Sequence, residues 1–180
     1  MSEGRKILIT GGVRSGKSRF ALSLAKASAQ PKIFLATAQL FDSEMAKRIE
    51  CHQKERDGKF STVEEPLYLS KAVDGLLANS VVIIDCLTLW LNNLLFHFKD
   101  DEKRIQEQIA LFIKSFRSSP ANIIIVTNET GWGIMPVNEL SRQYIEKAGA
   151  LNQEIAAISD EVVLMVSGVP LWAKGKTNEQ

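Results

Sequence analysis

The sequence contains few of the residues that build disulfide frameworks and metal centres. Its 180 residues include two cysteines, Cys51 and Cys86, and two histidines. Two cysteines are too few for the several disulfides that stabilise small secreted domains, and their spacing matches no zinc-binding pattern. These scarcities exclude a disulfide-rich secreted scaffold, and we expect the chain to work in a reducing, cytoplasmic environment.

Long hydrophobic runs and a surplus of charge of one sign are also lacking. Lys and Arg together number 22 and Asp and Glu 21, which gives a formal net charge of +1. This balance provides no overall attraction to nucleic acid or to an anionic membrane surface. No apolar stretch reaches the length of a membrane span, and the first residues do not read as a signal peptide.

What the sequence does contain is the composition of an ordinary globular domain, with 45% hydrophobic and 24% charged residues. A length of 180 residues fits a single domain, over residues 1–180. Short, nearly continuous apolar runs predict strands that are buried on both faces, as in a parallel sheet. The predicted strands are Lys6–Thr10, Lys32–Thr37, Val81–Asp85, Asn122–Thr127 and Glu161–Ser167. The helical patterns between them are Ser18–Ala29, Asp42–Arg56, Pro66–Ala78, Leu87–Phe98, Asp101–Phe116 and Asn138–Ile158.

The most specific motif follows the first predicted strand. Residues 11–18, here called the phosphate loop, read Gly-Gly-Val-Arg-Ser-Gly-Lys-Ser and match the pattern G-x-x-x-x-G-K-[ST]. Glycines let successive backbone N–H groups converge on one point, and the following helix directs its positive dipole end there. We predict that Lys17 reaches the β- and γ-phosphates of a nucleotide and that Ser18 holds Mg²⁺. The alternative is a glycine turn that opens an ordinary βα unit.

The motif and the alternation of strands with helices together predict the fold class. We expect an α/β, P-loop NTPase-like three-layer fold with a mainly parallel central sheet flanked by helices. In such sheets ligands bind beyond the carboxyl ends of the strands. The residues that follow each predicted strand are therefore candidate site residues.

Two carboxylates follow predicted strands. Asp85 ends an apolar run and has the form of an acid that holds Mg²⁺ directly or through water. Its alternative role is to cap the helix that starts at Leu87. For Glu129 two roles are open: it orients a substrate hydroxyl or supports a metal site, or it only bonds to backbone N–H groups in its loop.

A glycine-rich loop with an aromatic residue comes next, Gly131-Trp-Gly-Ile-Met-Pro136. It is interpreted either as a lid or wall of the acceptor pocket or as a plain turn packed by Trp132.

One histidine carries a catalytic hypothesis. In the predicted helix Asp42–Arg56, His52 shares a face with Arg48 and Arg56, at i−4 and i+4. Two guanidinium groups disfavour the charged imidazole and would also bind a triphosphate, so His52 is a candidate nucleophile toward a nucleotide. It also lies on an amphipathic stripe, so a packing role is open too. The second histidine, His97, ends an apolar helix and is interpreted as structural.

Several long motifs, in order, resemble one known family. They are the phosphate loop, Ala36–Gln39, Glu44–His52, Asp85–Leu94, Val126–Ile134 and Ser167–Leu171. The family is the bifunctional adenosylcobinamide kinase / adenosylcobinamide-phosphate guanylyltransferase of cobalamin biosynthesis, and the resemblance runs from about Ile7 to Leu171.

This resemblance implies two successive reactions and a set of site residues. Adenosylcobinamide is phosphorylated with ATP or GTP, and GMP is then transferred from GTP to adenosylcobinamide phosphate through a guanylyl-histidine, with release of pyrophosphate. The resemblance also implies a homotrimer and makes His52 the guanylylated catalytic residue. The motif predictions add Lys17 as a second catalytic residue and Ser18 and Asp85 as the Mg²⁺ ligands. The nucleotide-binding positions implied are Gly11, Gly12, Val13, Arg14, Ser15, Gly16, Lys17, Ser18, Thr37, Ala38, Gln39, Gln53, Lys54, Glu55, Arg56, Glu64 and Asp85.

Two other functions remain open from the sequence. One is a small-molecule kinase with a single activity, in which His52 is structural. The other is a nucleotide-dependent switch or binding module with no acceptor chemistry. A covalent GMP adduct that depends on His52 distinguishes the bifunctional enzyme from both.

Overall fold

A computed structural model describes residues 4–39, 58–99 and 101–175. The predicted helix Asp42–Arg56, which carries His52, lies outside the described residues. The described strands form one seven-stranded sheet in the order β3-β2-β4-β5-β1-β6-β7. The strands are β1 (Lys6–Gly11), β2 (Lys32–Ala36), β3 (Ser61–Glu64), β4 (Val81–Asp85), β5 (Asn122–Val126), β6 (Glu161–Val166) and β7 (Val169–Lys174). The helices are α1 (Lys17–Lys26), α3 (Leu69–Asp74), α4 (Leu87–Phe98), α5 (Glu102–Ser118) and α6 (Glu139–Ile158).

The five strands predicted from apolar runs are all present. Their ends agree with the prediction to within one residue, because buried parallel strands carry a strong hydrophobic signal. Every neighbouring pair is parallel except β6 and β7, which pair antiparallel. The mainly parallel sheet is therefore confirmed.

The prediction missed β3 and β7, which lie at the two edges of the sheet. All four residues of β3 are exposed, so the strand has no apolar run to reveal it. The turn between β6 and β7 consists of Ser167 and Gly168, with φ of 50° and 88°. Two turn residues between β-branched runs are a hairpin signal, and that signal was present in the sequence.

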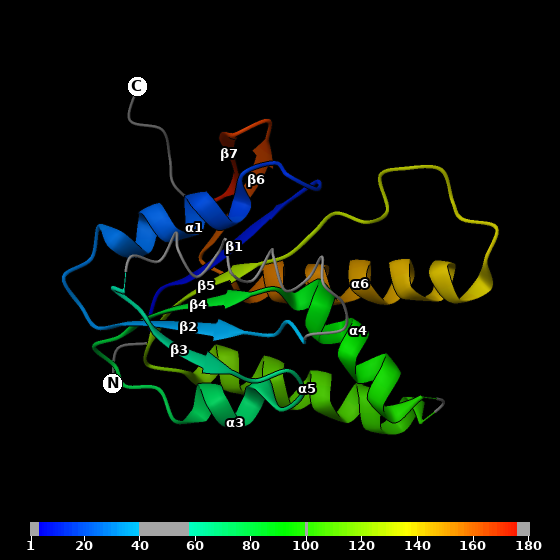
Figure 1. Cartoon of the computed structure of the whole chain (residues 1–180), viewed down its shortest axis with the longest axis horizontal. Helices are drawn as coiled ribbons and strands as arrows, with labels where there is room; N and C mark the ends of the chain where they lie inside the picture. The colour runs from blue at the N-terminus through cyan, green and yellow to red at the C-terminus, as the bar shows by residue number, and fades with distance from the viewer. Residues whose placement is uncertain (1–3, 40–57, 100, 176–180) are drawn as a thin grey trace.

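Helices cover both faces of the sheet, which gives three layers (Figure 1). On one face α1 packs through Ala21, Leu22 and Ala25. On the other face α3, α4, α5 and α6 enclose a larger core with Trp90 and Phe112 near its centre. Alternate strand residues serve the two cores, since Ile7 and Ile9 face α1 whereas Leu8 faces the four helices.

The helix predicted over Pro66–Ala78 is shorter than expected and spans Leu69–Asp74. Its expected first turn is replaced by side-chain contacts. The Glu65 carboxylate accepts the backbone N–H groups of Leu67 and Tyr68, at 3.0 and 2.7 Å. Asn93 donates to the Pro66 carbonyl and Trp90 to the Leu67 carbonyl, so both carbonyls have side-chain partners from α4.

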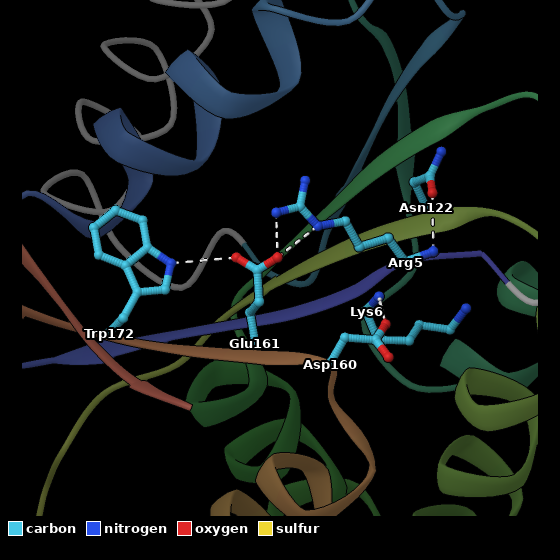
Figure 2. A network of polar contacts seen from close by, with 6 residues as sticks. All are labelled: Arg5, Lys6, Asn122, Asp160, Glu161 and Trp172. Carbon is cyan, nitrogen blue, oxygen red and sulfur yellow. Dashed lines mark hydrogen bonds and ion pairs between the residues drawn. The ribbon is translucent and has the colours of Figure 1, made fainter. Parts of the chain in front are cut away.

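Polar contacts join four strands at the amino end of the sheet, opposite the phosphate loop (Figure 2). The Glu161 carboxylate accepts from the Arg5 guanidinium at 2.6 Å and from the Trp172 indole at 3.2 Å. Asp160 accepts the Lys6 backbone N–H at 2.7 Å, and Asn122 accepts that of Arg5 at 2.9 Å. These contacts hold the start of β1 against β5, β6 and β7. No described helix is long and apolar enough to cross a membrane.

Candidate functional site

The phosphate loop connects the end of β1 to the start of α1 with a left-handed backbone at three positions. They are Gly11, Arg14 and Gly16, with φ of 146°, 55° and 94°. A Cβ on Gly11 would lie 2.5 Å from the Met165 carbonyl oxygen, so a side chain there would displace the loop from β6. The backbone geometry that this motif requires is present, and Gly11 and Gly16 are needed for it.

Lys17 opens α1 and turns its side chain back over the loop. It is only 7% exposed, and Nζ donates to the Gly12 carbonyl at 2.6 Å and approaches Ser15 Oγ at 3.5 Å. Its positive charge therefore lies against the loop, at the amino end of a helix whose first N–H groups point the same way. This is a favourable position for the phosphates of a nucleotide.

The β6–β7 hairpin supports the loop from one side. The Gly168 N–H donates to the Ser15 carbonyl at 2.9 Å. A Cβ on Gly16 would lie 3.4 Å from the Gly168 Cα, so the two glycines meet closely. The edge hairpin that the sequence analysis missed is thus part of the wall that holds the phosphate loop in place.

The end of β5 supports the loop from the other side. The Glu129 N–H donates to the Gly11 carbonyl at 3.1 Å, and the Thr10 hydroxyl donates to the Glu129 carboxylate. Thr10 is buried, at the end of β1. Among the described residues, the Glu129 carboxylate accepts a side-chain hydroxyl and no backbone N–H, which differs from the role within its own loop that the sequence left open.

Asp85 ends β4, one strand beyond β5. The N-cap residue of α4 is Cys86 and not Asp85, and the Cys86 side chain makes no capping hydrogen bond. Thr37 fixes the turn, since its hydroxyl donates to the Cys86 carbonyl and accepts the Cys86 N–H, both at 2.8 Å. The peptide bond between Asp85 and Cys86 is cis. The Asp85 carboxylate thus stands at the carboxyl edge of the sheet on a firmly held turn.

A chain of polar contacts ties this turn to β5 and α6. Asn128 donates to the Thr88 hydroxyl at 2.7 Å, and Asn152 donates to the Asn128 carbonyl at 3.2 Å. Tyr144 donates to the Thr88 carbonyl at 2.9 Å. Burial raises the pKa of Tyr144 to about 12, with a further contribution from Cys86. These hydrogen bonds connect the ends of β4 and β5 to each other and to α6, and the connected residues are called the platform below.

Cys86 lies inside this platform and is a free thiol. Burial raises its pKa to about 11, and the nearby Asp85 carboxylate adds to the effect. The thiol therefore stays protonated at neutral pH, which argues against a role as nucleophile or metal ligand.

The structure brings most of the predicted site residues that it describes to the carboxyl edge of the sheet. Ala38 and Gln39 follow β2 and are half-buried, and Thr37 between them and the strand is fully buried. Glu64 ends β3, beside Ala36 of β2. Within the described ranges, no group of three acidic, histidine or cysteine side chains is arranged to hold a metal. The predicted residues His52, Gln53, Lys54, Glu55 and Arg56 lie outside the described residues.

Sequence reasoning missed the residues that position the site. Thr10 holds Glu129, and Asn93 donates to the carbonyls of Thr37 and Pro66, at 2.7 and 3.1 Å. A signal existed for Thr10, because a hydroxyl residue ends an apolar run directly before the loop. The sequence carried no such signal for Asn93, because its hydrogen-bond partners are remote in sequence.

The loop between β5 and α6 extends away from the sheet (Figure 1) and exposes apolar side chains. Ile134 and Val137 are 98% and 96% exposed, and Trp132 is 68% exposed. The turn packed by Trp132 that the sequence left open is therefore not formed. The apolar loop is defined here as residues 131–137.

Comparison with known proteins places these features in one family. The family model described as "Cobinamide kinase / cobinamide phosphate guanyltransferase" matches residues 7–172. The chain is 42% identical to the bifunctional adenosylcobalamin biosynthesis protein CobP of Pseudomonas aeruginosa, over 94% of this chain and 97% of that protein. It is 39% identical to the protein CobU of Escherichia coli strain K12, which has the same description, over 93% of this chain and 99% of that protein.

Solved structures share the fold at low sequence identity. A prototypical ATPase from the type III secretion system of pathogenic bacteria is similar with a TM-score of 0.55 and 14% identity, over 91% of this chain and 51% of that one. An ATP synthase subunit, NeqB, from Nanoarcheaum equitans is similar with a TM-score of 0.54 and 13% identity, over 90% and 45% of the two chains. The predicted P-loop NTPase-like fold is confirmed.

Proposed function

This chain belongs to the cobinamide kinase / cobinamide phosphate guanyltransferase family and catalyses both reactions, and on that premise we propose how its residues divide them. Residues 1–180 act as one nucleotide-binding domain. The phosphate loop holds ATP or GTP while adenosylcobinamide is phosphorylated, and GTP while GMP is transferred to adenosylcobinamide phosphate. The single-activity kinase and the nucleotide switch considered from the sequence account for only part of this activity.

One observation carries the assignment of the phosphate loop as the nucleotide site of both reactions. The phosphate loop has the left-handed backbone of its motif and carries the buried Lys17 charge, with Asp85 and Glu129 following neighbouring strands. Lys17 stabilises charge that develops on the transferred phosphates in both reactions. A second part of the nucleotide site lies farther from the loop. It consists of Thr37, Ala38 and Gln39, which follow β2, and of Glu64, which ends β3.

We propose that Ser18 and Asp85 hold the Mg²⁺ ion of the nucleotide. Ser18 directly follows Lys17 in α1, and Asp85 ends β4. The Ser18 hydroxyl and the Asp85 carboxylate both supply the hard oxygen atoms that Mg²⁺ prefers. Mg²⁺ usually keeps several waters and binds through one or two protein groups plus substrate phosphates, so a two-residue set fits it. When bound, the ion neutralises negative charge on the phosphates.

Replacing Asp85 by asparagine will slow both reactions by about 10²-fold and raise the Mg²⁺ concentration needed for half-maximal rate. The amide keeps the size of the side chain but loses the charge that attracts the ion. Removal of divalent metal with EDTA will stop both reactions in the unaltered enzyme. Initial rates against Mg²⁺ concentration measure the effect, with Asp74→Asn on the exposed end of α3 as the matched control. An unchanged Mg²⁺ dependence in Asp85→Asn would leave this carboxylate outside the metal site.

The guanylyl transfer needs a nucleophile that the phosphate loop lacks, and we propose His52 for this role. The imidazole attacks the α-phosphorus of GTP, pyrophosphate leaves, and the GMP carried on nitrogen is then transferred to the phosphate of adenosylcobinamide phosphate. Gln53, Lys54, Glu55 and Arg56 lie next to it in sequence, and the two cationic groups among them favour the triphosphate.

We also propose that the enzyme is a homotrimer. The apolar loop supports this, because several large apolar side chains stand almost fully exposed on one segment. Light scattering on the purified chain is expected to give three times the 20.0 kDa mass of one copy. Replacing Ile134 and Val137 by aspartate will lower that mass if the apolar loop forms the contact, whereas an unaltered trimer in this double variant would assign the contact to another surface.

A further inference from the structure

We propose that Glu129 binds the alcohol group of cobinamide and accepts its proton in the kinase reaction. The inference rests on the proposed function of the phosphate loop and extends it to the acceptor substrate. It makes Glu129 specific to one of the two reactions that this chain catalyses.

The placement of Glu129 follows from the order of the strands. β5 lies between β1, which leads into the phosphate loop, and β4, which ends in Asp85; Val126 at its end pairs with Ile9 and with Asp85. The chain leaves β5 along the loop, and the Glu129 N–H bonds to the Gly11 carbonyl at 3.1 Å. The backbone of Glu129 is thus attached to the first residue of the loop that holds the phosphates.

The carboxylate is oriented by a contact on only one of its oxygens. The buried Thr10 hydroxyl donates to Oε1. Among the residues that the structure describes, no hydrogen bond reaches Oε2. The side chain is half-buried, so one oxygen is fixed against the protein while the other is available to a substrate. A carboxylate held in this way is suited to accept a hydrogen bond from an alcohol.

The other acids at this edge are less well placed for this role. Glu64 ends β3, and β2, β4 and β5 separate that strand from β1. Asp85 ends β4, with β5 between it and β1. Glu129 is bonded both to the loop, through its N–H and the Gly11 carbonyl, and to the strand that leads into the loop, through the Thr10 hydroxyl. Lys17 lies at the same place but is a donor, so it cannot receive the proton.

The alcohol oxygen of cobinamide forms a bond to the γ-phosphorus, and the bond from that phosphorus to the bridging oxygen breaks. The nucleoside diphosphate leaves with that electron pair. The alcohol proton passes to Oε2 of Glu129 and from there to water, so the carboxylate is restored.

Guanylyl transfer, the second reaction, does not require a group that accepts an alcohol proton. In guanylyl transfer the acceptor is the phosphate of cobinamide phosphate, whose oxygens are already negatively charged at neutral pH. No alcohol proton has to be removed. A carboxylate dedicated to the alcohol therefore affects the kinase reaction much more than the transfer, although both use the same loop.

The test compares the two reactions in one variant. In Glu129→Gln the amide keeps the shape and still accepts from Thr10, but it takes no proton. We expect kcat for phosphorylation of cobinamide to fall by about 10²- to 10⁴-fold, with KM for the nucleotide little changed. Transfer of GMP to supplied cobinamide phosphate is expected to fall by a far smaller factor. Glu129→Asp is expected to recover part of the kinase rate, and Glu107→Gln on the exposed face of α5 is the matched control.

Two results would overturn the proposal. An equal loss of both reactions in Glu129→Gln would assign the carboxylate to the nucleotide or its metal, and an undiminished kinase rate would remove it from the proton transfer. Thr10→Val provides a second route if the first variant is poorly folded, because it loses only the orienting hydroxyl; it is expected to slow the kinase selectively. Failure of the phosphate-loop assignment looks different, because Lys17→Met would then leave both reactions intact.

Discussion

Replacing His52 by alanine is expected to abolish guanylyl transfer, with a fall of about 10⁴-fold or more, while phosphorylation of cobinamide continues. The reason is that, in the proposed mechanism, the imidazole forms a covalent bond in one reaction and none in the other. A phosphoramidate between GMP and the imidazole divides a difficult displacement into two easier ones. Incubation with GTP labelled at the α-phosphate will give a labelled protein only when His52 is present.

The chain offers a matched control for this experiment. His97 is the second of its two histidines, exposed on α4 with its ring against Phe98. His97→Ala is expected to form the adduct at the normal rate. Mass mapping will place the added GMP, which is lost in acid, on the peptide that contains residue 52. Label on another residue, or an adduct that persists in His52→Ala, would contradict the assignment.

Replacing Lys17 by methionine is expected to lower kcat of both reactions by about 10²- to 10³-fold, because both use the phosphate loop. Methionine keeps most of the length of the side chain and removes the charge. Lys17 is buried against the loop at the start of α1, with Nζ donating to the Gly12 carbonyl. Binding of a fluorescent GTP analogue is expected to weaken in parallel.

The control for this variant is Lys103→Met, which removes the same charge from an exposed position on α5. Circular dichroism will show whether Lys17→Met is folded, since α1 packs through Ala21, Leu22 and Ala25 and does not depend on the lysine. A loss confined to one reaction would mean that the two reactions use separate nucleotide sites. That result would contradict the shared loop.

The variants of Lys17, His52 and Glu129 together test which residues the two reactions share and which are separate. In the proposed division Lys17 serves both reactions, His52 serves guanylyl transfer, and Glu129 serves the kinase step. In this proposal a small domain carries out two phosphorus chemistries because one loop that binds polyphosphate is used in both. The separate parts need only one side chain each.

The sequence alone determined the elements whose signal is local. Continuous apolar runs such as Val81–Asp85 marked the buried strands, and the glycines and Lys17 of residues 11–18 identified the phosphate loop before any strand order was known. These features are local because burial on both faces and a left-handed backbone each restrict the residue types that can occupy a position.

Only the tertiary structure decided how the site is held together. It placed β5 between β1 and β4, so that Thr10 meets Glu129 across 119 positions of sequence, and it set the β6–β7 hairpin against Ser15. It also bonded the Pro66 and Leu67 carbonyls to side chains of α4, in a segment that the sequence had predicted as helix. Contacts of this kind depend on which strands become neighbours, and strand order is set by the packing of the whole core and not by the residues next to each other in the chain.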